Sequence, residues 1–80
     1  MSDETKGRRA KEILEDEVFL EAEAMAEATA VKQWKTEMDQ SKRDALWHQI
    51  QALQATRVAL EVLVGRGTIA AHQKESRLDA

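Results

Sequence analysis

The sequence predicts an all-α protein, with two long amphipathic helices in an antiparallel hairpin. The 80 residues contain no Pro and only three Gly, residues of high helix propensity dominate, and apolar residues recur at three- and four-residue steps. So short a chain buries only about 60% of the surface that it exposes when unfolded, and it has no Cys to form disulfides or zinc sites. We therefore expect the hairpin to self-associate or to dock on a partner.

Residues 1–10 are expected to form a flexible basic arm. The candidate phosphate contacts are Lys6, Arg8, Arg9 and Lys11. Four charges without an aromatic residue or a recognition helix are more typical of a solubilising terminus, and nucleic acid bound through them would dissociate steeply with salt. Because the net charge is −3, nucleic acid is a partner that we do not favour.

Residues 11–37 are expected to form the first helix, since this stretch contains neither Pro nor Gly. Its apolar residues fall on two neighbouring stripes, and so wide a face favours a bundle over a lone hairpin. Glu17, Glu21 and Glu27 interrupt the stripes, which argues against a strict coiled-coil seam. The stripes consist of Ile13, Leu20, Ala24, Val31, Trp34 and Met38, and of Leu14, Val18, Met25 and Ala28.

A turn at residues 38–41 and a second helix at 42–64 are expected to follow. Ser41 and Asp44 resemble a capping box, with Asp in place of the preferred Glu or Gln. Gly65 is suited to the left-handed residue that ends a helix, so residues 65–80 are expected to form a polar tail, either a short helix or disordered. The apolar stripe of the second helix consists of Leu46, Ile50, Leu53, Leu60 and Val64, with Arg57 in its one polar position and Trp47 and Val58 on its flank.

Trp34 and Trp47 are two of only three aromatic residues. Antiparallel pairing about residue 40 places both indoles at the same level, near the closed end of the hairpin. They either fill the end of the core or form an aromatic contact for a partner subunit.

Seven carboxylates and no basic residue occur between Glu12 and Glu27. Antiparallel pairing brings Arg57 and Arg66 alongside this acidic block, which is one way to offset its self-repulsion. The block is interpreted as a solvated face or as a subunit contact, with Glu15, Glu21 and Glu23 as partner-contact candidates. A metal site is disfavoured because no His joins the carboxylates, and no cofactor is expected.

Enzymatic activity is not expected. His48 and His72 stand apart, without Ser or carboxylate partners in register. No apolar run reaches the length of a membrane span, and residues 1–12 lack the apolar segment of a secretory signal. We therefore expect no membrane partner and no export by a signal peptide.

Several short motifs resemble those of small, uncharacterised helical proteins of tailed bacteriophages, which tend to be encoded among head and packaging genes. The matching segments are residues 13–19 (ILEDEVF), 31–34 (VKQW), 43–47 (RDALW), Leu60 and 64–67 (VGRG). The chain departs from that pattern at residues 37–42, where such proteins often carry a Pro and a Gly.

The resemblance implies a structural or assembly component of a phage virion that is associated with the capsid, the portal or the scaffold. The implied partner is the chain itself or another phage structural protein, in the virion or in the host cytoplasm during assembly. It supplies no catalytic residues. The alternative is a small DNA-binding or packaging-regulatory protein that uses the basic arm.

Overall fold

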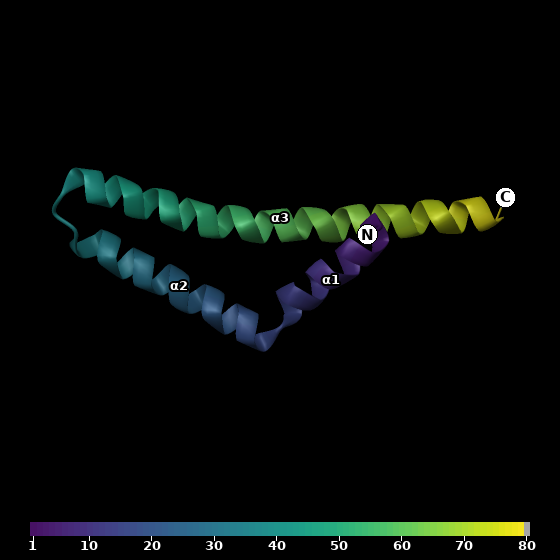
Figure 1. Ribbon diagram of the computed structural model, residues 1–80, viewed down its shortest axis with the longest axis horizontal. Helices are drawn as coiled ribbons and strands as arrows, with labels where there is room; N and C mark the ends of the chain where they lie inside the picture. Colours follow the sequence, from purple (N-terminus) through teal and green to yellow (C-terminus); the bar gives the residue numbers. More distant parts are fainter. Residues whose placement is uncertain (80) are drawn as a thin grey trace.

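The computed structural model describes residues 1–79, with only the backbone described for residues 78 and 79. They form three α-helices in the order α1 (Asp3–Glu15), α2 (Glu17–Thr36) and α3 (Gln40–Asp79) (Figure 1). The prediction of an all-α chain is confirmed. The number and bounds of the helices differ from those expected, and each difference has a local physical cause.

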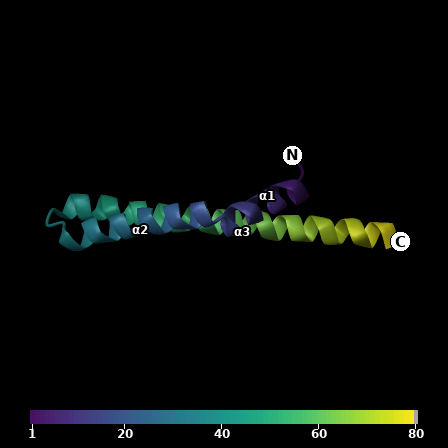
Figure 2. The same cartoon turned by 90° about the horizontal axis from the view of Figure 1, so that it is seen from below.

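The molecule is long and open. It measures 63 × 24 × 17 Å, and its radius of gyration of 17.7 Å exceeds the value of about 12 Å for a compact chain of this length. The helix α3 runs along the whole molecule, α2 runs antiparallel to it from the loop at residues 37–39, and α1 turns back to cross it (Figures 1 and 2). The last part of α3 continues beyond the crossing with α1.

The helix α1 replaces the expected flexible arm, and that expectation is corrected. The Ser2 side chain accepts a hydrogen bond from the Thr5 N–H at 3.1 Å, which satisfies one of the free donors at a helix start. Asp3 and Glu4 in the first turn add favourable charge near the positive end of the helix dipole. These residues begin a helix upstream of the basic cluster.

A break at Asp16 divides the helix that was expected to be continuous over residues 11–37. Asp16 has an extended backbone (φ −72°, ψ 122°), and its Oδ1 accepts a hydrogen bond from the Phe19 N–H at 2.8 Å. Asp side chains compete with the helical pattern for backbone N–H groups. Asp16 therefore ends α1, caps α2 and lets α1 turn back towards α3.

The cap of α3 is Asp39, so the expected cap at Ser41 is corrected. Asp39 Oδ1 accepts from the Lys42 N–H at 3.0 Å, and the Asp39 carbonyl accepts from the Arg43 N–H at 2.9 Å. Ser41 lies inside the helix, and Asp44 Oδ1 accepts from Gln40 Nε2 at 2.9 Å. The helix consequently begins at Gln40 instead of residue 42.

The helix α3 continues through Gly65 and Gly67 to Asp79, so the expected tail from residue 65 is corrected for all but Ala80, which lies outside the described residues. No glycine in the described chain has a positive φ. Gly67 instead permits close approach, because a Cβ built there would lie 2.8 Å from the Gly7 Cα and 3.0 Å from the Asp3 carbonyl oxygen. The glycine marks a helix crossing instead of a helix end.

The interior is thin and is lined by small residues. The buried residues of the described chain are Gly7, Ala10, Ala30, Ile50 and Gly67. The protein exposes 6332 Å², whereas a compact monomer of 9.0 kDa exposes about 4,850 Å². The contact between α1 and α3 is therefore made by close backbone approach, with no large side chain of α1 fully buried in it.

Candidate functional site

The closed end of the molecule brings the two tryptophans together. The ring centroids of Trp34 on α2 and Trp47 on α3 lie 6.2 Å apart, at an interplanar angle of 39°. The prediction that both indoles lie at the same level is confirmed by this distance. Trp34 is half-buried and Trp47 is 48% exposed, so one indole packs inside this end while the other also faces solvent.

Arg43 closes this end of the molecule, a role that sequence reasoning did not assign to it. Its Cζ lies 4.5 Å from the centroid of Trp34, within the range of a cation–π interaction. Its Nη1 donates to the carbonyl oxygens of Trp34 at 2.7 Å and Glu37 at 3.2 Å, so a cation sits at the negative end of α2. The available signal was an Arg in the first turn of α3 that follows a Trp in the last turn of α2.

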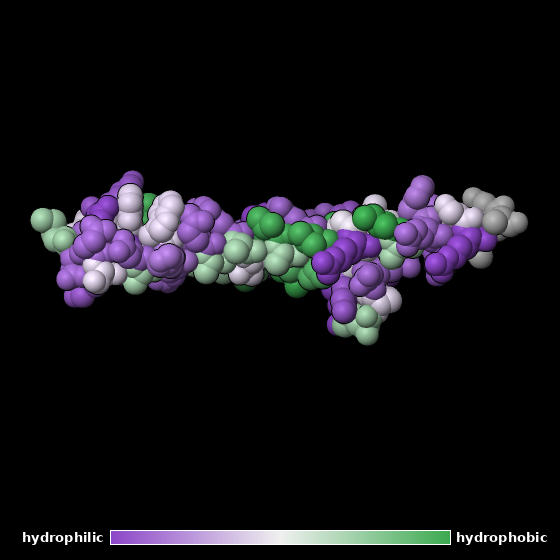
Figure 3. Space-filling model, turned by 90° about the horizontal axis from the view of Figure 1, so that it is seen from above, coloured by the Kyte–Doolittle hydropathy of each residue, from purple (hydrophilic) through white to green (hydrophobic). Residues whose placement is uncertain are grey.

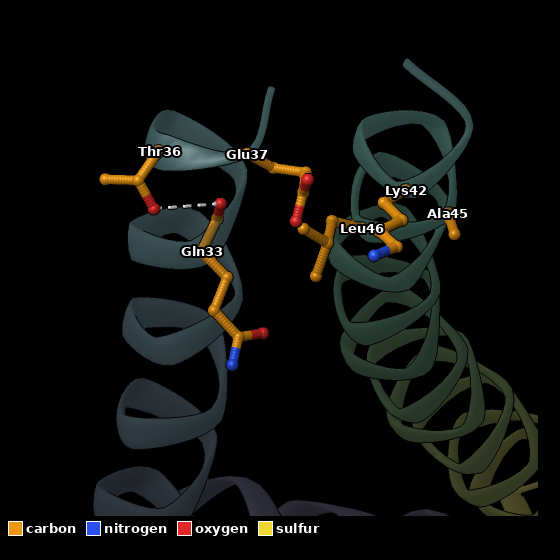
Figure 4. Close-up of a pocket in the computed structure, with 6 residues that line it drawn as sticks. All are labelled: Gln33, Thr36, Glu37, Lys42, Ala45 and Leu46. Atoms are coloured by element: carbon orange, nitrogen blue, oxygen red, sulfur yellow. Dashed lines mark hydrogen bonds between the residues drawn. The ribbon is translucent and has the colours of Figure 1, made fainter. Parts of the chain in front are cut away.

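An open hollow lies beside this cluster, between the end of α2 and the start of α3 (Figure 4). Its lining residues are Gln33, Thr36, Glu37, Lys42, Ala45 and Leu46. Two polar side chains there are engaged locally, since Thr36 Oγ1 donates to the Gln33 carbonyl at 3.4 Å and Glu37 Oε1 accepts from the Asp39 N–H at 3.1 Å. Among the side chains that the structure describes, no three of Asp, Glu or His are grouped so as to hold a metal ion.

The acidic block is partly neutralised from within the chain. Arg57 Nη2 and Nε donate to Glu23 Oε1 at 2.6 and 3.0 Å, and Glu61 Oε1 lies 3.9 Å from Arg57 Nη1. The hydrogen bond with Glu23 is the main cause that raises the pKa of Arg57. The side chains of Arg57 and Glu23 are 38% and 17% exposed. Through these hydrogen bonds Glu23 joins α2 to α3.

The other two acidic candidates remain open to solvent. Glu15 and Glu21 are exposed, as are Glu12 and Glu17. We call Glu12, Glu15, Glu17 and Glu21 the outer carboxylates. They, and not Glu23, offer negative charge to a partner.

The basic residues of α1 do not share one surface. All four are exposed, but at about 100° per residue Lys6 and Arg9 lie on one flank of the helix while Arg8 and Lys11 lie on the other. Glu4 and Glu12 are the helical neighbours of Arg8, four residues before and after it. The mobile cluster of positive charge expected from the sequence is therefore replaced by a helix of mixed charge.

Exposed apolar residues form a stripe on α3 that sequence reasoning missed. Val58, Val62 and Ile69 are 55%, 45% and 60% exposed, and Gly65 lies between the last two on the same face. We call Val58, Val62, Gly65 and Ile69 the outer stripe. Apolar surface covers the middle of α3 when it is viewed from the side away from α1 and α2 (Figure 3).

The signal for this stripe was the four-three-four spacing of its members. It was overlooked because the helix was expected to end at Gly65, which separates Ile69 from the two valines. Exposed apolar residues also occur on α2, where Val18 and Met25 are the most exposed of the large apolar side chains.

Comparisons with known proteins give no relative for this chain. No protein-family model matches it, and neither a curated protein nor a solved structure is significantly similar to it. Across the described residues, none of the helices combines the length and the apolar character needed to cross a membrane.

Proposed function

We propose that this protein is a non-enzymatic structural or assembly module, which acts through helix–helix contacts with a second copy or with another protein. The working unit is the helical hairpin of α2 and α3, closed by Trp34, Arg43 and Trp47. The observation that carries the proposal is the amount of large apolar surface that the chain leaves exposed.

The total exposed surface of the chain also fits an interaction module. The chain exposes 6332 Å², about 1,500 Å² more than a compact monomer of its mass. A standard protein–protein interface buries about 800 Å² on each partner. The excess surface is therefore larger than the surface that one such interface buries on each partner.

The resemblance of the motifs at residues 13–67 supplies the biological context, which we propose to be the particle of a tailed phage. Capsid-, portal- and scaffold-associated roles all fit a long helical module, located in the virion or in the host cytoplasm during assembly. The outer carboxylates would favour a partner with a basic surface.

Mass spectrometry of purified particles tests this context, together with deletion of the gene. We expect the chain to be present in mature or precursor particles and particle yield to fall on deletion. Absence from both kinds of particle, with normal yield, would contradict the proposal.

The alternative function is DNA binding through Lys6, Arg8, Arg9 and Lys11, and their exposure on α1 is the observation that favours it. It predicts duplex binding that weakens steeply with salt and that is lost when all four are replaced by Gln. Duplex binding that survives this replacement would exclude the basic residues of α1 as the contact.

A further inference from the structure

The outer stripe has the spacing of a coiled-coil seam. Val58, Val62, Gly65 and Ile69 are separated by four, three and four residues, which assigns Val62 and Ile69 to the a positions and Val58 and Gly65 to the d positions of a heptad. The a positions continue upstream to Ala55. The spacing is that of a helix face that packs along another helix, and α1 and α2 both lie on the other side of α3.

No contact within the described chain requires a glycine at position 65. A Cβ built on Gly65 would meet nothing within 4 Å, whereas one built on Gly67 would meet the backbone of α1 at 2.8 Å. The two glycines therefore face opposite sides of α3. Gly67 serves the internal crossing, and Gly65 lies in the middle of the exposed seam.

The charges that flank the seam are complementary between two parallel copies. Glu61 occupies a g position and Arg66 the e position five residues later, which is the pairing used across parallel two-stranded coiled coils. Both residues are exposed, and no ion pair between them is formed within the described chain. Val62 and Ile69 at the a positions are β-branched, as a positions of parallel two-stranded coiled coils often are.

We propose that a second copy of this chain covers the outer stripe, with the two α3 helices parallel and in register. Val62 then packs against Val62 of the partner subunit, and Glu61 pairs with Arg66 of the partner subunit, twice by symmetry. The inference rests on the proposed function and names the partner for one of its surfaces. Over its whole length the chain exposes about 1,500 Å² more than a compact monomer of its mass, and a standard interface buries about 800 Å² per copy.

Sedimentation equilibrium of the full chain over the micromolar range tests whether the stripe is the contact. We expect a monomer–dimer equilibrium whose dissociation constant rises at least tenfold when Val62 and Ile69 are both replaced by Glu. The matched control replaces Val18 and Met25 by Glu, because these residues are at least as exposed as Val62 and Ile69 but lie on α2. Circular dichroism checks that both variants stay helical. A monomer at every concentration, or equal loss of dimer in the control, overturns the proposal.

Two further variants test the parallel register. The chain has no Cys, so Val62→Cys introduces a single thiol, and we expect it to form a disulfide-linked dimer faster than Val18→Cys under the same oxidant. Glu61→Arg and Arg66→Glu should each weaken the dimer, and the double variant should restore it. Failure of both the cross-link and the restoration overturns the parallel arrangement. Particle incorporation is measured separately, so a monomeric chain found in particles contradicts this inference and leaves the proposed function standing.

Discussion

Gly7 and Gly67 place the backbones of α1 and α3 in direct contact. A Cβ built on Gly7 would lie 2.8 Å from the Gly67 Cα and 2.9 Å from the Leu63 carbonyl oxygen. Both neighbours are backbone atoms, so a methyl group at Gly7 can be accommodated only if one helix moves. The close crossing depends on glycine at both positions.

Replacing Gly7 or Gly67 by Ala is therefore expected to destabilise the α1–α3 contact. Overpacking of this kind costs about 1–3 kcal/mol, and the better helix propensity of Ala returns about 1 kcal/mol. The matched control is Gly65→Ala, which meets nothing within 4 Å in the single chain and, at concentrations too low for the proposed dimer, should stabilise it by about 0.5–1 kcal/mol. Thermal unfolding gives the sign of each change, and hydrogen exchange shows whether the amides of α1 lose protection. Equal effects at Gly65 and Gly67 would contradict the crossing.

The two glycines also show where sequence reasoning reaches its limit. The composition and spacing were sufficient to predict the helical class, the level of the two indoles and the approach of Arg57 to the acidic block. They were not sufficient to separate a glycine that ends a helix from one that lets another helix approach. That distinction depends on α1, most of whose residues the sequence predicts to be a flexible arm.

Asp16 presents the same difficulty in another form. Asp16 stands among six Glu residues, so the sequence predicts that it belongs to a charged helix face. The residues around it do not distinguish an N-cap Asp from an exposed carboxylate in the middle of a helix. The break at Asp16 allows α1 to contact α3. That contact is tertiary, so the local sequence does not reveal it.

Replacing Asp16 by Ala is expected to destabilise the chain by about 1 kcal/mol, the usual cost of losing an N-cap, because the Phe19 N–H loses its 2.8 Å acceptor. The variant should also straighten the junction and reduce the protection of α1. Glu15→Ala is the control, since Glu15 is exposed and caps no helix. Thermal unfolding and hydrogen exchange measure the two effects, and a variant with normal α1 protection would show that the cap does not hold the bend.

Trp34 and Trp47 are expected to respond differently to truncation. Trp34 is half-buried beneath Arg43, so Trp34→Ala should cost about 2–3 kcal/mol, less than the 3–5 kcal/mol of a fully buried Trp. Trp47 is 48% exposed, and Trp47→Ala should cost less than Trp34→Ala. Urea unfolding followed by circular dichroism measures both. A larger loss at Trp47 would mean that a second copy buries it.

Glu23 and Arg57 are expected to depend on each other. Glu23→Gln removes the charge from the acceptor at 2.6 Å and should lower the melting temperature, with an effect that shrinks as salt screens the pair. Glu21→Gln removes the same charge from an exposed residue and should leave the melting temperature nearly unchanged or raise it. A double-mutant cycle with Arg57→Met isolates the pair. Equal shifts for the two Gln variants would mean that the pair adds nothing beyond net charge.

The outer carboxylates separate an assembly role from a nucleic-acid role. A duplex lying along α2 would be repelled by them, whereas a partner protein with a basic surface would be attracted. The attraction should weaken as the Debye length falls from about 10 Å at 0.1 M salt to about 3 Å at 1 M. Glu23 is left out of the test because it pairs with Arg57.

Replacing Glu15 and Glu21 by Gln is therefore expected to leave the fold intact while reducing recovery of the chain in purified particles. The control replaces Glu4 and Glu75 by Gln, which removes the same charge from residues near the two ends of the chain, away from Glu15 and Glu21. A loss specific to Glu15 and Glu21, and greater when particles are washed at high salt, would locate a basic partner at the junction of α1 and α2. Equal recovery of both variants would show that the outer carboxylates form an ordinary solvated face, because a contact driven by their charge must respond when that charge is removed.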